Sequence, residues 1–508
     1  MKINKFLLAG VTALGLGMTA CNNDDVPLVD KPTGGSTFAG MYISAMKDVV
    51  TRTVNDKQED YGGREAESKL ETLRLISSGV PRDWTLGQAD EENKFWETTP
   101  AGTYTVAPWK ATSGTQPMAL LFNRGVLEAN IATAADQVYG STATAVADIA
   151  ALATENKFVM TSKAEQKTIK DNISEETAKT GTGEAQNVFA FDMERVVSQG
   201  MVVKGADLNA TTADGKGTVN LADLTYTAIN GAAKTYLFRN HVGERTITEN
   251  DGLYKDFTSA IDDYTDFSAA QSPTGSAQDK LIRLGNLLPK ETSTADDLGM
   301  YAAKTVAADA TEAKKGAGIY FLENSVTKDA FTSENKNFGY YRLPYAKVYT
   351  TYIPKEVLHW DQGQKKLITK PGVQGETFYR GEGDGLIYAS KEAAEKSQLA
   401  PGQKAYTYEK GRCAYRALWN RQTSADGKTV VNANVRRNNT YLLTIMAFQG
   451  LGMPWDPSDP KDPYLPKPDD KEEPTNPENP DIEKEETYMR VEAKVLQWNL
   501  VSRNVVLE

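Results

Sequence analysis

The sequence has few of the residues that build metal sites and disulfide frameworks. Its 508 residues include two cysteines, Cys21 and Cys413, and two histidines, His241 and His359, which lie far apart. Two isolated histidines without metal-ligand spacing do not indicate a metal centre. A disulfide scaffold is excluded as well, because Cys413 has no partner if Cys21 is modified. Stability must therefore come from a buried core.

Catalytic motifs are also missing. We find no phosphate-binding glycine loop with Lys-Ser/Thr, no nucleophile-elbow pentapeptide and no Cys-x-x-Cys pair. The glycine-rich stretch 381–385 lies between expected strands and indicates a hairpin loop. A catalytic carboxylate pair is the one arrangement that the sequence leaves open, since any two of 68 acidic residues can converge. We therefore expect a protein that is not an enzyme and holds no cofactor.

Positive charge is scarce in comparison with negative charge. The net charge is −11, and no basic stripe or RNA-binding aromatic motif is present, so nucleic acid is not an expected partner. Hydrophobic content of 40% and charged content of 25% are ordinary for a globular protein. The length predicts at least two domains.

The N-terminus has the pattern of an export signal. Lys2 and Lys5 precede an apolar stretch, residues 6–18, that is too short to span a membrane. The following Met18-Thr19-Ala20-Cys21 looks like a bacterial lipobox. It implies a signal peptide over residues 1–20 and lipidation of Cys21. The alternative is an ordinary secretory signal followed by a coincidental cysteine.

A strand and an exposed basic loop follow. Residues 37–46 are β-prone, with Phe38, Met41 and Ile43 among their apolar side chains, and predict a strand buried in a sandwich. The polar passage 47–63 then carries Arg52 and Arg64, and a basic residue in an exposed loop is a proteolysis site by physical criteria. The alternative is that Arg52 is one of many solvated surface arginines.

Short strands dominate the rest of the chain. Glycine, proline and asparagine turns separate them, which favours β-sandwiches, with a few helices in an alanine-rich stretch at 129–154 and near 304–315. The glycine-rich passage 205–217 indicates either a domain boundary or a hairpin loop. The many tyrosines of these strands are interpreted as amphipathic sandwich residues rather than a ligand site.

The chain ends in a strand on a tether. Nine prolines interleaved with Asp and Glu occur between Pro454 and Pro480, which predicts an extended, solvated and semi-stiff segment. Two period-two strand patterns follow it, with apolar faces made by Met489, Val491, Ala493 and Val495 and, beyond Trp498, by Val501, Val505 and Leu507. The tail either pairs with its own sandwich or is a strand donated to another subunit.

Several stretches together resemble the Mfa-like fimbrillins, the major shaft subunits of type V pili of Bacteroidota. The resembling stretches keep their order along most of the chain: 158–161, 191–197, 320–325, 349–355 and 435–445, followed by the acidic proline-rich tether and the ending with Leu496-Gln497-Trp498. The resemblance to this family rests on the combination with the lipobox, since no single motif is highly specific.

The resemblance implies a fold and an assembly route. The fold would be mainly β, with two transthyretin-like β-sandwich domains, a few short helices, a proline-rich tether and C-terminal donor strands. An arginine-specific protease would cut between Arg52 and Thr53 and remove the strand of Phe38, Met41 and Ile43, and the tail of the next subunit would fill the empty groove. The implied segments are signal peptide 1–20, propeptide 21–52, domains 53–204 and 205–453, tether 454–487 and donor strands 488–508.

The expected function is that of a structural shaft subunit in a cell-surface fimbria that supports adhesion and biofilm formation. Its implied partners are copies of itself in a head-to-tail filament, anchor and tip subunits, the protease, and the outer membrane, which holds the lipidated precursor before it enters the extracellular fimbrium. The alternatives are an anchor or tip fimbrial subunit and a surface lipoprotein that binds glycans. The seven tryptophans are scattered along the sequence, which argues weakly against a glycan site.

Overall fold

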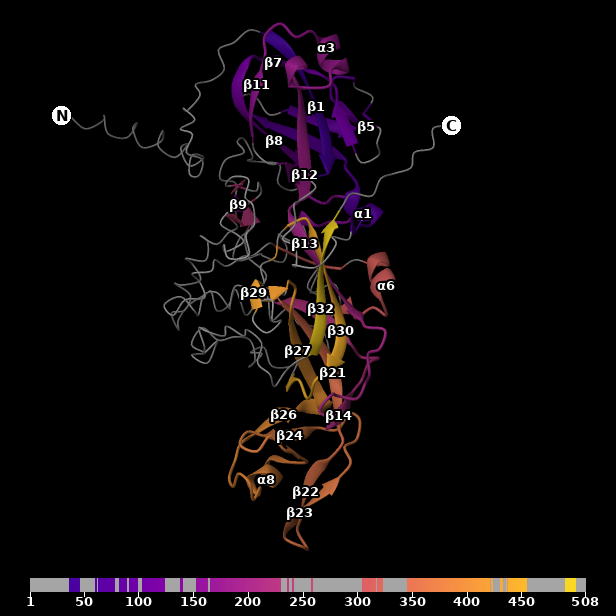
Figure 1. Cartoon of the computed structure of the whole chain (residues 1–508), viewed down its shortest axis with the longest axis vertical. Helices are drawn as coiled ribbons and strands as arrows, with labels where there is room; N and C mark the ends of the chain where they lie inside the picture. The colour runs from indigo at the N-terminus through magenta and orange to yellow at the C-terminus, as the bar shows by residue number, and fades with distance from the viewer. Residues whose placement is uncertain are drawn as a thin grey trace, which may run out of the picture.

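The protein is a mainly β structure that consists of several sheets and a few short helices (Figure 1). The computed structural model describes residues 36–45, 60–61, 63–77, 82–88, 91–98, 103–123, 138–139, 152–162, 165–229, 235–236, 240–241, 257–258, 304–316, 318–322, 345–420, 422–423, 430–432, 435, 437–454 and 489–498.

The N-terminal sheet has ten strands in the order β10-β12-β1-β6-β5-β4-β3-β8-β11, with β7 paired to β1. A further pairing of β10 with β8 closes the path from β10 to β8 into a ring, and β11 pairs with β8 outside it. Its largest buried side chains include Trp84 and Trp109, whose rings meet edge to face at 5.6 Å. The strands are β1 (Ser36–Ala45), β3 (Thr72–Ser77), β4 (Arg82–Leu86), β5 (Lys94–Thr98), β6 (Thr103–Val106), β7 (Trp109–Thr112), β8 (Gly114–Phe122), β10 (Met160–Ser162), β11 (Glu165–Ile169) and β12 (Val188–Arg195).

The chain passes from this sheet to the next at a single residue, Val196. β13 (Val197–Lys204) follows β12 directly but pairs with β30 (Asn439–Phe448) and β20 (Ile319–Leu322) in the second sheet. That sheet has the order β2-β32-β30-β13-β20 and also contains β2 (Asp60–Tyr61) and β32 (Met489–Trp498). β13 thus lies in the second sheet, although the sequence analysis assigns its residues to the first domain.

A third sheet packs on the second and completes the C-terminal sandwich. Its path is β19-β15-β21-β27-β31, with β14 paired to β21. Trp419 lies fully buried between the two layers, where its ring stacks on that of Phe321 with the centroids 5.3 Å apart. The Trp419 ring also fills the space that a side chain at Gly200 would need. The strands are β14 (Gly217–Val219), β15 (Thr225–Ile229), β19 (Lys304–Thr305), β21 (Tyr345–Pro354), β27 (Arg412–Leu418) and β31 (Met453–Pro454).

The residues between β21 and β27 form an inserted subdomain at the far end of the molecule (Figure 1). β21 and β27 pair with each other, so the insertion leaves and rejoins the sandwich at neighbouring points. It has its own five-stranded sheet, β23-β22-β25-β24-β26, and a small core around Tyr388. The strands are β22 (Val357–Asp361), β23 (Lys366–Lys370), β24 (Phe378–Gly381), β25 (Ile387–Tyr388) and β26 (Ala405–Tyr408). The sequence predicts several of these strands but assigns them to the sandwich itself.

The hairpin predicted at 381–385 is confirmed, because β24 and β25 pair on either side of it. Asp384 fixes this loop by accepting hydrogen bonds from Ser397 Oγ (2.6 Å), Gln403 Nε2 (2.7 Å) and the Leu386 N–H (2.9 Å).

The described helices are short, with four to six residues each. α3 (Glu175–Thr180) covers β1, and α6 (Ala310–Lys315) contacts β13; the others are α1 (Glu65–Ser68) and α8 (Lys391–Glu395). Side-chain caps begin three of them, as at Ser174, whose hydroxyl accepts from the Thr177 N–H. The remaining paired strands are β9 (Val138–Tyr139) with β16 (Thr235–Tyr236), β17 (Asn240–His241) with β18 (Phe257–Thr258), and β28 (Gln422–Thr423) with β29 (Val430–Asn432).

Candidate functional site

The first described strand, β1, lies inside the N-terminal sheet and not at its edge. Its second half pairs in parallel with β12, from Gly40 opposite Val188 to Ala45 opposite Met193. On its other side, β1 pairs antiparallel with β7 and β6. β1 therefore has neighbours on both sides, and removing it would open a gap between β12 and the β6–β7 pair.

The side chains of β1 alternate between the core and the outside. Thr37, Ala39, Met41 and Ile43 are buried, whereas Tyr42 is 37% exposed and Phe38 is half-buried. Met41 and Ile43 are each 0% exposed and belong to the main core of the N-terminal sheet. Burial of each of these two side chains contributes about 1.5–3 kcal/mol. The seat of β1 is thus a row of inward positions at a spacing of two residues.

Gly40 allows β1 to approach the helix α3 closely. A Cβ at this position would lie 2.7 Å from the carbonyl oxygen of Ala178, a backbone atom that has little freedom to move. The backbone N–H of Gly40 donates to the carbonyl of Asn187 at 2.9 Å. A strand that occupies this seat therefore needs a very small residue where it passes α3.

Asn187 completes the polar side of the seat. It is fully buried in a left-handed conformation (φ 57°), and its side-chain amide donates to the carbonyls of Phe38 (3.0 Å) and Lys170 (2.8 Å). Its side-chain oxygen accepts from the Lys170 N–H at 2.8 Å. The one signal that the sequence gives for Asn187 is an asparagine directly before a predicted strand, which does not by itself predict this role.

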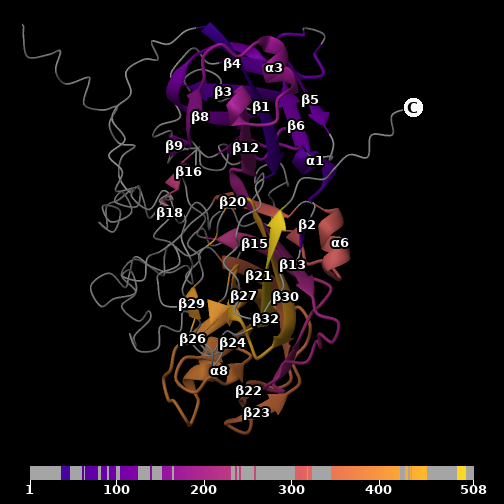
Figure 2. The same ribbon diagram turned by 45° about the horizontal axis from the view of Figure 1, so that its top comes forward.

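The C-terminal strand β32 lies in the second sheet of its own chain. It pairs antiparallel with β30, from Met489 opposite Phe448 to Gln497 opposite Asn439, with a bulge between Ile445 and Ala447. Met489 is buried in the C-terminal core and Arg490 is exposed. The predicted strand is confirmed, and within the described residues its pairing is with its own sandwich. Both views place β32 alongside β30 (Figures 1 and 2).

β32 is an edge strand along most of its length. Among the described residues, its only outer neighbour is the two-residue strand β2, which pairs in parallel with Gln497 and Trp498. The residues from Met489 to Leu496 therefore have backbone partners on one side only within the described chain. β1 thus has paired strands on both sides, whereas most of β32 has a paired strand on one side only within the described chain.

A buried polar cluster lies directly after β2, where the N-terminal sheet meets the second sheet. The Glu67 side chain is 0% exposed and accepts hydrogen bonds from Arg64 Nε (3.0 Å), Gln199 Nε2 (3.0 Å) and the Tyr320 hydroxyl. Burial by itself lowers the pKa of the Arg64 guanidinium, but its contacts with Tyr320 and Glu67 outweigh this effect and raise the pKa above its usual range. Burial and Glu67 both raise the pKa of Tyr320. The cluster therefore favours charged Arg64 and neutral Tyr320.

One of the two arginines that the sequence predicts as proteolysis sites, Arg64, belongs to this cluster. Arg64 is bonded to Glu67, to Glu155 (2.9 Å) and to Tyr320 (3.2 Å), and its side chain is 18% exposed. A protease needs an extended, accessible segment, which this position does not provide. Arg52 and Thr53 lie outside the described residues, as does Cys21.

Two of the stretches that carry the family resemblance meet at the same junction. Asn438 adopts a left-handed conformation, and its side-chain oxygen accepts from the backbone N–H of Arg195 at 3.1 Å. The Arg195 guanidinium in turn donates to the Glu67 carbonyl (2.9 Å) and to Ser68 Oγ (3.0 Å). These residues fix the bend at Val196, where the chain changes sheets.

The predicted site residues fall into three groups. The structure brings Met41 and Ile43 together on the inward face of β1 and places Phe38 on the opposite face. For the tail, it gives the backbone pairing of Met489, Val491, Ala493, Val495 and Trp498 within β32. Val501, Val505 and Leu507 lie outside the described residues.

Two other kinds of site were sought in the described part of the chain. No group of three His, Cys, Asp or Glu side chains gathers there in a way that could hold a metal ion. None of the described helices is long and apolar enough to cross a membrane.

The C-terminal part of the chain matches a known protein family. Residues 406–504 match the family model described as major fimbrial subunit protein type IV, fimbrillin, C-terminal. The matched residues include β27, β30 and β32, so they contain both the tail strand and the strand that it pairs with. The C-terminal part of the chain is therefore similar to the C-terminal region of fimbrillins, which are major fimbrial subunits.

Solved structures of fimbrial proteins align with this chain along most of its length. A fimbrilin from Porphyromonas gingivalis W83 is 14% identical, with a TM-score of 0.40 over 92% of this chain and 99% of that chain. The tip fimbrial protein Mfa3 from Porphyromonas gingivalis, solved with a C-terminal truncation, is 10% identical, with a TM-score of 0.30 over 91% of this chain and all of that chain.

Proposed function

We propose that this protein is a fimbrial shaft subunit that polymerises by protease-triggered donor-strand exchange. A cut after Arg52 separates β1 from the rest of the chain, β1 leaves its seat, and the C-terminal tail of another subunit takes its place. The observation that carries this proposal is the contrast between the two strands. β1 lies near the N-terminus in an enclosed seat, whereas the tail strand β32 lies at a sheet edge.

This contrast supplies a driving force for the exchange. When β32 leaves β30, it gives up backbone hydrogen bonds along one side and a short contact with β2. In the seat of β1 it gains partners on both sides. Each additional hydrogen bond contributes a net stabilisation of about 0.5–1.5 kcal/mol. Several such bonds, added to burial of the apolar face, favour the exchanged state.

The pattern of the tail supports its fit to the seat. Residues 489, 491, 493 and 495 are apolar at a spacing of two, as are the buried positions from 37 to 43 apart from Thr37.

Covalent attachment explains why a cut is needed. While β1 is joined to its own domain, it competes for the seat at the high effective concentration of a short linker, which is on the order of millimolar. After the cut, β1 can be lost by dilution. Because donor and acceptor surfaces differ, the contact is head to tail and forms an open filament.

The cellular setting follows from the same proposal. Lipid on Cys21 holds the precursor at the outer membrane, and the cut after Arg52 releases it for assembly into an extracellular fimbrium with anchor and tip subunits. The glycan-binding alternative requires exposed aromatic rings, whereas Trp84, Trp109 and Trp419 are buried.

Limited proteolysis tests this function. Lipid-free protein treated with a trypsin-like protease at low dose should acquire a new N-terminus at Thr53 and then form an SDS-resistant ladder. Arg52→Ala should prevent both the cut and the ladder, whereas the Arg64→Ala variant should still be cut after Arg52. A cut that yields only monomers under all conditions would contradict the proposal.

A further inference from the structure

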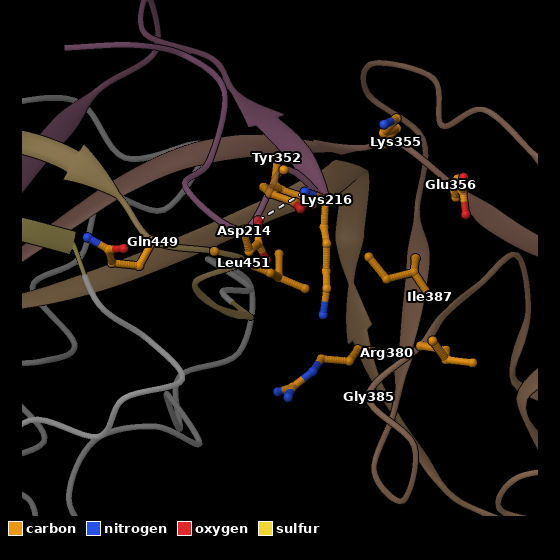
Figure 3. A pocket seen from close by; sticks show the side chains of 13 residues that line it. Asp214, Lys216, Tyr352, Lys355, Glu356, Arg380, Gly385, Ile387, Gln449 and Leu451 are labelled. Atoms are coloured by element: carbon orange, nitrogen blue, oxygen red, sulfur yellow. Dashed lines mark hydrogen bonds between the residues drawn. The ribbon is translucent and has the colours of Figure 1, made fainter. Parts of the chain in front are cut away.

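A cleft lies between the C-terminal sandwich and the inserted subdomain. Its volume is about 540 Å³. The sandwich contributes Lys216 and Leu451 to its lining, and the subdomain contributes Arg380 from β24 and Ile387 from β25 (Figure 3). The cleft is separate from the seat of β1, which belongs to the N-terminal sheet.

Two cationic side chains converge in the cleft. Lys216 and Arg380 extend toward the same space from opposite sides (Figure 3). The nearby carboxylate of Asp214 already accepts hydrogen bonds from the Thr212 hydroxyl (2.6 Å) and the Lys216 backbone N–H (3.0 Å). Leu451 and Ile387 add apolar surface beside the cations. This combination suits a peptide that carries carboxylates next to apolar groups.

The acidic tether begins and ends beside this cleft. Gln449, Gly450 and Leu451 line it, and β31 ends three residues later at Pro454. At the other end of the tether, Met489 pairs with Phe448. Residues 455–488 therefore leave and return close to the cleft, and they contain twelve acidic residues against four lysines.

The first part of the tether has a regular spacing of carboxylates. Asp456, Asp459 and Asp462 each stand directly before a proline, at intervals of three residues. A residue before proline favours the extended or polyproline conformation. In polyproline II, with three residues per turn, these carboxylates share one face at intervals of about 9 Å.

We propose that the Lys216–Arg380 cleft binds residues 456–462 of the chain's own tether through their carboxylates. This contact holds the base of the tail against its own C-terminal sandwich. It is a property of the uncut monomer and does not depend on strand exchange, so it can be tested without any polymerisation.

Carbodiimide cross-linking of the uncut protein tests the contact. The reagent converts an aspartate carboxylate into an activated ester. The Lys216 amine attacks the carbonyl carbon of this ester, which forms an amide and releases the reagent as a urea. We expect peptides that join Lys216 to residues 456–462, at a yield at least ten-fold above that of the exposed Lys366 on β23. The combined substitutions Asp456→Asn, Asp459→Asn and Asp462→Asn should abolish the link, and Arg380→Gln should reduce it.

A mixture of isotopically heavy and light protein distinguishes a tether of the same chain from the tether of a second copy. Links within one chain contain only heavy–heavy or light–light pairs, which is the expected result. Mixed pairs at a statistical yield would overturn the proposal in favour of the tether of a second copy. Equal yields at Lys216 and Lys366 would overturn it altogether.

Discussion

Substitution of Ile43 by Ala should weaken the hold of the N-terminal sheet on β1. Ile43 is 0% exposed in the core, and it pairs with Phe191 of β12 and Tyr104 of β6. Truncation of a buried Ile to Ala costs about 2–5 kcal/mol. In protein cut after Arg52, this cost should weaken the retention of the β1 peptide by roughly 30-fold to several thousand-fold, at 1.4 kcal/mol per factor of ten.

The assay uses lipid-free protein with a fluorophore on its N-terminus. After the cut, the loss of the labelled peptide is followed by size exclusion in an excess of unlabelled peptide. Ile43→Ala should accelerate both this loss and ladder formation, while uncut Ile43→Ala should remain monomeric. The matched control is Tyr42→Ala, because Tyr42 is 37% exposed on the opposite face. Equal rates for the two variants would refute the reasoning that inward burial retains β1.

Three further predictions concern single residues. Asn187→Ala should destabilise the N-terminal sheet by about 2–4 kcal/mol in chemical denaturation, since it leaves buried carbonyls of the β1 seat without donors and replaces a residue at positive φ; a loss below 0.5 kcal/mol would contradict this role. Glu67→Ala should cost about 3–5 kcal/mol, because it strips a buried acceptor from Arg64, Gln199 and Tyr320; unchanged denaturation would contradict it. Burial raises the pKa of the Cys413 thiol to about 12, so native protein should resist thiol labelling at pH 8. Between about pH 9 and 10 the thiol ionises only in the unfolded protein, which should lower stability by about 1.4 kcal/mol per pH unit. Cys413→Ala should remove this contribution, and an unchanged pH dependence in that interval would contradict it.

The sequence predicts an element correctly where the local residue pattern alone determines its structure. The alternation of Met489, Val491, Ala493 and Val495 predicts a strand, and the structure contains β32 there. The glycine-rich loop at 381–385 is the hairpin that its turn residues indicate. These cases need only the period of two and the conformational freedom of glycine.

Other features depend on contacts that no local pattern shows. The inserted subdomain has strands like those of the sandwich, and only the pairing of β21 with β27 reveals that it is an insertion. No glycine, proline or asparagine stands beside the change of sheet at Val196, so the domain boundary is predicted at the glycine-rich passage 205–217 instead. Asn187 and Glu67 act through partners more than 100 residues away, such as Phe38 and Gln199.

The candidate site was predictable in part. Met41 and Ile43 face the core as the strand pattern indicates, but the sequence does not show that Phe38 lies on the other face or that Gly40 meets α3. It also leaves open whether the tail pairs with its own sandwich, and β32 does so in the single chain. Transfer of the tail to another subunit remains a prediction.

A two-component mixture tests that transfer most directly. The acceptor is cut after Arg52 and carries Val491→Asp, Ala493→Asp and Val495→Asp, so its seat is open and the apolar face of its β32 is lost. The donor carries Arg52→Ala, so its seat stays filled and its tail is native. The account predicts that neither component assembles alone and that together they form SDS-resistant heterodimers and nothing longer. Dimers of the acceptor alone, or no heterodimer at all, would contradict the donation of the tail to the seat of β1.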